Sequence, residues 1–180
     1  PEGFFSYYGT VQWETVDRRF YPTRGVVLRA DYSLYTDNFA IYDGGPPFSA
    51  LAWNFAPVVP VTNRFSLLPS LYGRVLIGGN TAYSYLNCMG GAEFGRYRSH
   101  QLPFAGISNV EIFDNALLVA RLRLRQRMGS KHYLFLTGNY ALCDANFFDV
   151  FGEKGMWGAS AGYSRDSRIG PVDFVFSFSD

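Results

Sequence analysis

The chain has 180 residues and a formal net charge of +1, a length typical of one domain, and it lacks the basic runs that bind nucleic acid. Aromatic residues make up 18% and hydrophobic residues 48%, with 19 Gly and a mean hydropathy of -0.04. No apolar stretch reaches the roughly 18 residues of a membrane helix, which excludes helical spans. A membrane β-barrel is not excluded, because its strands alternate between apolar and polar residues and so average to neutral hydropathy.

Eight segments read as strands, because they are rich in β-branched and aromatic residues and are bounded by Gly, Pro, Asn or Asp. None of them has a helical period. In chain order, we expect strands at residues 5–17, 25–36, 49–59, 64–78, 116–128, 131–142, 156–166 and 171–179.

The connections between these segments alternate strictly between short and long. The short ones span residues 18–24, 60–63, 129–130 and 167–170, and the long ones 37–48, 79–115 and 143–155. A soluble sandwich or lipocalin has no general reason to collect its long loops at one end. An outer-membrane barrel does, since its periplasmic turns are short and its extracellular loops are long.

The segment "ALLVARLRLRQRM" tests this reading most directly. Leu118, Ala120, Leu122 and Leu124 share one face, and Arg121, Arg123, Arg125 and Arg127 share the other, because strand side chains alternate. Four arginines cannot enter a dry core without partners. The stripe is therefore either the exposed edge of a soluble sheet, with its charges in water, or the wet lumen wall of a membrane strand.

The other segments favour the lumen wall. A charge that faces lipid at mid-membrane costs roughly 2–4 kcal/mol, so polar faces should point inward. Arg29, Asp31 and Ser33 lie opposite Leu28, Ala30, Tyr32 and Leu34, and Asp173 and Ser177 lie opposite Val172, Phe174 and Phe176. We expect an all-β, antiparallel transmembrane barrel.

The order of these motifs resembles the bacterial surface antigen family, the barrels of BamA-type assembly factors and two-partner secretion transporters. The turn "DRRFYPTRG" is similar to a periplasmic turn of that family. "LNCMGGAEFGRYRSHQLPF" resembles its long inward-folding loop, and "ASAGYSRDSRIGPVDFVFSFS" resembles its closing hairpin. The resemblance covers nearly the whole chain as about eight strands of a barrel of about sixteen.

The resemblance implies a loop latch. Gly90, Gly91 and Arg96 match the family's loop motif, whose arginine meets an Asp inside the lumen. Thr137 stands where that Asp belongs, so we expect a hydrogen bond from Arg96 to an acceptor near Thr137. Asp31, Glu14 or Glu111 would supply the counter-charge.

Domain organisation follows from the same resemblance. We expect residues 1–180 to be a single barrel-domain fragment, without the upstream periplasmic or catalytic domains and without a final strand. The loop "FGRYRSHQLPFAG" is most similar to the barrels attached to outer-membrane patatin-like phospholipases. The turn arginines Arg18, Arg19 and Arg24 would lie at the periplasmic rim, near lipid head groups or an upstream domain, or would simply be solvated.

The expected function is membrane-protein assembly, polypeptide translocation, or anchoring and export of an upstream lipase domain in the bacterial outer membrane. Outer-membrane lipids, polypeptide clients and the upstream domain are the expected partners. The alternative is a soluble, eight-stranded, lipocalin-like barrel that binds an apolar ligand.

We expect no cofactor, metal site or enzymatic activity in this chain. Ser99 and His100 are neighbours in sequence, which does not by itself make a catalytic pair. Cys88 and Cys143 have no metal-type spacing and are either a disulfide or two free thiols.

Overall fold

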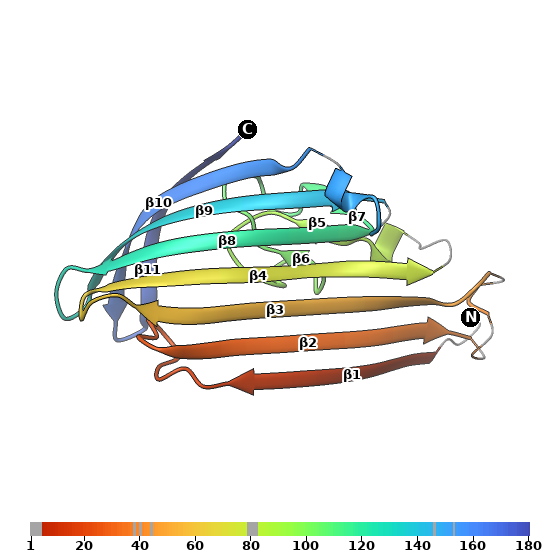
Figure 1. The fold of residues 1–180 in the computed structure, drawn as a ribbon, viewed down its shortest axis with the longest axis horizontal. Coiled ribbons are helices and arrows are strands. Elements are labelled where there is room, and N and C mark those ends of the chain that lie inside the picture. Colours follow the sequence, from red (N-terminus) through yellow and green to blue (C-terminus); the bar gives the residue numbers. More distant parts are fainter. Residues whose placement is uncertain are drawn as a thin grey trace.

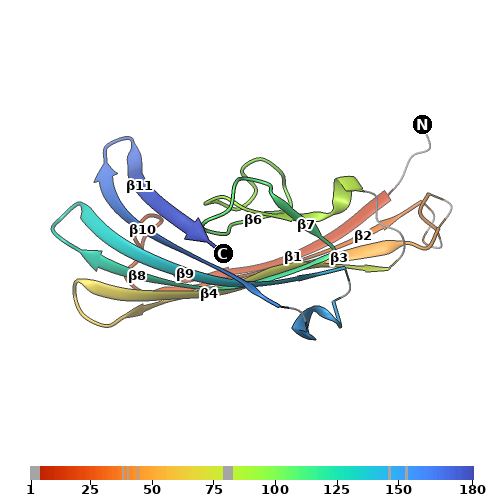
Figure 2. The same cartoon turned by 90° about the horizontal axis from the view of Figure 1, so that it is seen from above.

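The computed structural model describes residues 5–37, 39, 41–43, 45–78, 83–145, 147–152 and 154–180. One long, curved sheet dominates the molecule (Figure 1), and smaller elements lie against its concave face (Figure 2). Among the described residues, no helix is long and apolar enough to cross a membrane.

The main sheet has eight strands in the order β1-β2-β3-β4-β8-β9-β10-β11, and every neighbouring pair is antiparallel. The described parts of β1 and β11 are its two edges, so the sheet is open. The strands are β1 (Phe5–Glu14), β2 (Gly25–Thr36), β3 (Phe48–Pro60), β4 (Phe65–Gly78), β8 (Ala116–Arg127), β9 (His132–Asp144), β10 (Met156–Ser167) and β11 (Gly170–Ser179).

The eight strands confirm the eight predicted segments. Seven agree to within two residues at each end, but β1 ends at Glu14 whereas the prediction continued to residue 17. The reason is Asp17, whose carboxylate accepts hydrogen bonds from the backbone N–H groups of Thr23 (2.7 Å) and Arg24 (3.3 Å). These bonds close a turn over residues 17–24, so the chain leaves β1 before residue 17.

All short turns lie at one end of the sheet and all long connections at the other (Figure 1). The longest connection carries a 3-10 helix, η1 (Tyr83–Tyr85), and a small sheet of β5 (Asn87–Met89), β6 (Gln101–Leu102) and β7 (Ile112–Asp114). A second 3-10 helix, η2 (Val150–Gly152), precedes β10. The predicted sorting of connections by length is confirmed.

The strand register assigns every side chain to a face, because directly paired residues lie on the same side of a sheet. In β8, Arg121 pairs with Asn139 and Arg123 with Thr137, whereas Leu122 pairs with Pro69 and Gly138. The concave face carries the arginines and the long loop. The convex face exposes apolar side chains, among them Phe55, Leu71, Leu122, Leu136, Tyr140, Trp157, Phe174 and Phe176.

The apolar core lies on the concave side, between the sheet and the long loop. Met89, Leu102 and Phe104 of the loop pack against Leu117 and Val119 at the start of β8. Tyr72 and Ala141 complete the cluster. The half of the concave face nearest the long connections is therefore dry, and the arginines of β8 begin where this core ends.

Leu122→Arg tests the assignment of the convex face to lipid. Leu122 lies at the middle of β8 with 46% of its surface exposed. An arginine at the middle of a membrane strand should lower the free energy of unfolding by about 2–4 kcal/mol. Urea denaturation in lipid vesicles measures this value, and Leu122→Met is the matched control. Equal stability of the two variants would show that lipid does not contact this position.

Candidate functional site

The four arginines of β8 form a stripe along the concave face, and Arg123, Arg125 and Arg127 contact neutral groups. Arg123 Nε donates to Thr137 Oγ1 (3.1 Å) and lies 4.8 Å over the Phe135 ring. Arg125 donates to the Pro22 carbonyl and lies over the Tyr133 ring. Arg127 donates to the Asn63 carbonyl at 3.0 Å. The stripe keeps its positive charge, because these contacts carry no negative charge to offset it.

Arg96 makes a different contact from the predicted one. Its guanidinium pairs with Glu93 at 3.1 Å on the loop, with side chains 54% and 63% exposed. The hydroxyl of Thr137 accepts from Arg123 instead. The prediction therefore has to be corrected: the structure does not bring Arg96 to Thr137, because a local carboxylate holds Arg96 and a nearer arginine occupies Thr137.

None of the three expected counter-charges contacts Arg96 in the described structure. Asp31 pairs with Arg29 at 2.7 Å, and the Glu111 carboxylate accepts the backbone N–H of Ser108 at 2.6 Å. Glu14 lies at the exposed end of β1. None of these contacts involves Arg96.

Gly90 and Gly91 shape the base of the loop. Their φ angles of 143° and 74° lie in a region that residues with a Cβ rarely adopt. A Cβ on Gly91 would meet the Asn109 side chain at 2.0 Å, and Gln101 Nε2 donates to the Gly90 carbonyl at 2.8 Å. The double glycine thus allows two segments of the loop to lie against each other.

Beside the apolar core, a group of described hydrogen bonds around Arg74 and Asn87 holds the loop to the sheet. Asn87 is fully buried and donates to the carbonyls of Arg74 (2.8 Å) and Asn115 (2.6 Å). Arg74 is 5% exposed, and its guanidinium donates to Asn87 Oδ1 and to the Tyr85 carbonyl. On the same face, the Tyr72 hydroxyl donates to the Pro103 carbonyl at 2.6 Å. The sequence has no local signal for the role of Asn87.

The turn between β1 and β2 folds inward across the concave face. Tyr21 stacks on Tyr133 of β9, with ring centres 4.0 Å apart and planes 6° apart. Its hydroxyl hydrogen-bonds Ser164 of β10. Strands β3, β4 and β8 separate β2 from β9 in the sheet order, so this turn bridges the concavity near its short-turn end.

The remaining reactive side chains form no catalytic arrangement within the described ranges. Ser99 Oγ and His100 Nδ1 lie 3.4 Å apart, and no cluster of metal-ligating residues is present there. Cys88 and Cys143 are both free thiols, which resolves the two alternatives for the cysteines in favour of no disulfide.

Comparison with known proteins identifies one family. The sequence model of the OMP85 superfamily matches residues 2–180, nearly the whole chain. A search of curated proteins found no match.

Asn87→Ala tests the loop anchor. The substitution removes one acceptor of the buried Arg74 guanidinium and both hydrogen bonds that Asn87 donates to backbone carbonyls, so loop opening should become about 1.5–3 kcal/mol easier. Proteolytic cleavage within residues 83–115 should then speed up about 10- to 150-fold, if opening is fast relative to cleavage. Arg96→Ala is the control, since an exposed ion pair contributes about 0–1 kcal/mol. Equal cleavage rates in the two variants would contradict the assignment.

His100 makes the loop sensitive to pH. Burial, with the charges of Arg74 and Arg98, lowers the pKa of His100 from 6.5 to about 4. In the opened loop His100 regains its ordinary pKa of 6.5, so between pH 6.5 and 4 the opened loop binds a proton that the closed loop does not. The closed loop should therefore be most stable above pH 6.5, and its stability should fall as pH falls toward 4. The ratio of cleavage rates between wild type and His100→Gln, measured at several pH values, isolates this effect. A ratio that does not change with pH would contradict it.

Proposed function

Because the chain belongs to the OMP85 superfamily of outer-membrane barrels, we propose that its curved sheet is one wall of a barrel whose concave face contacts polypeptides during membrane-protein assembly or translocation. Outer-membrane lipids would cover the convex face. Residues 1–180 would be a single barrel-domain segment within a larger barrel of about sixteen strands.

The two-sided character of the sheet carries this proposal. The convex face exposes large apolar side chains along the length of the sheet, a pattern that monomeric soluble proteins rarely show. The concave face has the opposite character, with an arginine stripe and many hydrogen-bonding groups. A chain that passes along such a face could exchange hydrogen bonds with it instead of losing its contacts with water.

The lipocalin-like alternative needs the reverse arrangement. An apolar ligand would require an apolar interior and a charged exterior. The described sheet has its charged stripe on the concave face and its exposed aromatic residues on the convex face. We therefore set this alternative aside.

A second candidate is the anchoring or export of an upstream patatin-like lipase domain of the same polypeptide. The loop "FGRYRSHQLPFAG", at residues 94–106, supports it by its resemblance to barrels of that kind. In both candidate functions the concave face contacts a polypeptide. In the first it belongs to another protein, and in the second it is the upstream domain of the same chain. Neither candidate assigns catalysis to this chain.

Site-specific photo-cross-linking in living cells tests the proposal and separates the two candidates. A photoreactive residue at Ser70, which pairs with Arg121 on the concave face, should form polypeptide adducts. The same residue at Leu122, on the convex face, should not. Adducts with other proteins indicate assembly or translocation, and adducts within the same polypeptide indicate anchoring. The absence of polypeptide adducts at Ser70 would overturn both.

A further inference from the structure

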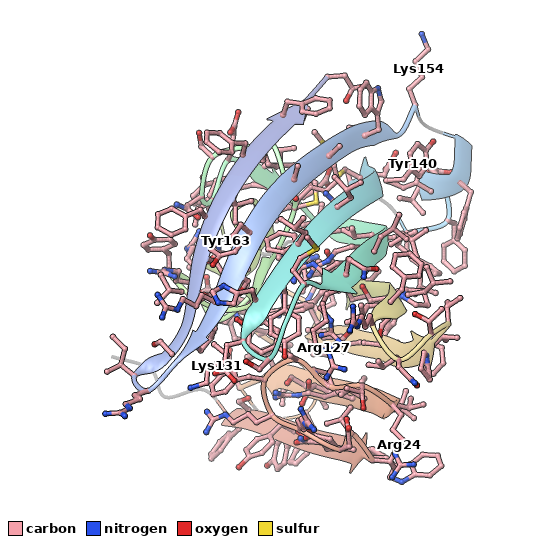
Figure 3. All side chains as sticks on the ribbon, turned by 90° about the vertical axis from the view of Figure 1, so that its left-hand side faces the viewer. Arg24, Arg127, Lys131, Tyr140, Lys154 and Tyr163 are labelled. Carbon is pink, nitrogen blue, oxygen red and sulfur yellow. The ribbon has the colours of Figure 1, made fainter. Side chains whose placement is uncertain are left out.

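A pocket of about 630 Å³ opens on the concave side, at the end of the sheet where the short turns lie. Five arginines line it: Arg18, Arg24, Arg64, Arg125 and Arg127. They come from two turns and from β8, so separate parts of the chain converge on one volume. Figure 3 looks onto this end of the molecule and labels Arg24 and Arg127.

The single acidic residue in the lining, Asp17, offsets only part of the charge of five arginines. Both oxygens of Asp17 are occupied within its own turn, Oδ1 by two backbone N–H groups and Oδ2 by the Thr23 hydroxyl at 2.5 Å. The hydrogen bond from Thr23 holds the pKa of Asp17 at about 2. Across the described part of the chain, none of the five arginines forms a salt bridge.

Arg125 is the arginine of the pocket that would gain most from a bound anion. Only 8% of its surface is exposed, and its partners are a carbonyl oxygen and an aromatic ring. A buried guanidinium without a negative partner is costly, because it loses its hydration without gaining a counter-charge. An anion in the pocket would supply that counter-charge.

The pocket is also held in shape before any ligand arrives. Tyr21, which forms part of its wall, stacks on Tyr133 and bonds to Ser164. The φ angle of Tyr21 is 51°, a left-handed conformation that a bulky residue adopts only where its surroundings enforce it. A wall fixed in this way reduces the ordering cost of binding.

We propose that this pocket binds a phosphate group, carried by a lipid headgroup or by a soluble phosphate ester. Several arginine forks around one volume match the many oxygens of a phosphate, whereas a carboxylate is satisfied by one fork. The volume exceeds that of a phosphate ion alone and leaves room for the rest of a headgroup or ester. The inference goes beyond the proposed function, because it does not depend on which polypeptide contacts the barrel.

Binding to the full-length protein, purified in a phosphate-free non-ionic detergent, tests this inference. The probes are glycerol 3-phosphate and a soluble, short-chain phosphatidylglycerol, both measured by calorimetry. The double variant Arg24→Gln, Arg64→Gln removes two exposed arginines of the pocket. We expect it to weaken binding at least tenfold.

The control is a second double variant, Arg19→Gln, Arg168→Gln, which loses the same charge from exposed positions outside the pocket. It should bind like the wild type. Binding of glycerol 3-phosphate assigns a soluble ester as a ligand, and binding of the short-chain phosphatidylglycerol alone assigns a headgroup. Equal weakening in both double variants, or no binding of either probe, would overturn the inference. So would binding of an acidic peptide that neither phosphate probe displaces.

Discussion

The structure depends on one constraint: the register in which β8 pairs with β4 and β9. That register places Arg121, Arg123, Arg125 and Arg127 on the concave face together with Thr137. A slip of one residue would move every side chain of β8 to the opposite face. Four arginines would then face lipid, at a cost that falls from roughly 2–4 kcal/mol each at mid-membrane to about 0–1 kcal/mol near the interface. The arginine stripe therefore specifies the pairing as strongly as the apolar face does.

The concave face has two halves, and this division organises the rest of the molecule. Toward the long connections, Leu117 and Val119 are fully buried beneath Phe104 and Met89 of the loop. Toward the short turns, the same face of β8 continues as arginine, and Tyr21 reaches it from the first turn. One half thus packs the loop by apolar burial, and the other presents charge to a solvated hollow. The long loop thus covers one half of the concave face and leaves the other half available for binding.

Much of the fold could be predicted from sequence, because period-two alternation and turn residues are local signals. They gave the eight strands, their faces and the sorting of the loops. The small strands β5, β6 and β7 span only two or three residues each, which is too short to show a period. The Arg74–Asn87 anchor joins residues on different elements, and the predicted Arg96–Thr137 contact failed because Glu93 is a closer partner. Contacts of this kind depend on how the loop folds, which no local pattern encodes.

The claim that lipid faces one side of the sheet and water the other can be tested most directly by labelling single cysteines placed in turn at residues 120–125 of β8, in the protein inserted in membranes. The unsubstituted protein serves as the blank for Cys88 and Cys143. We predict that a lipid-soluble reagent labels positions 120, 122 and 124, and that a water-soluble reagent labels 121, 123 and 125. Labelling without this alternation, or with the opposite alternation, would contradict the account.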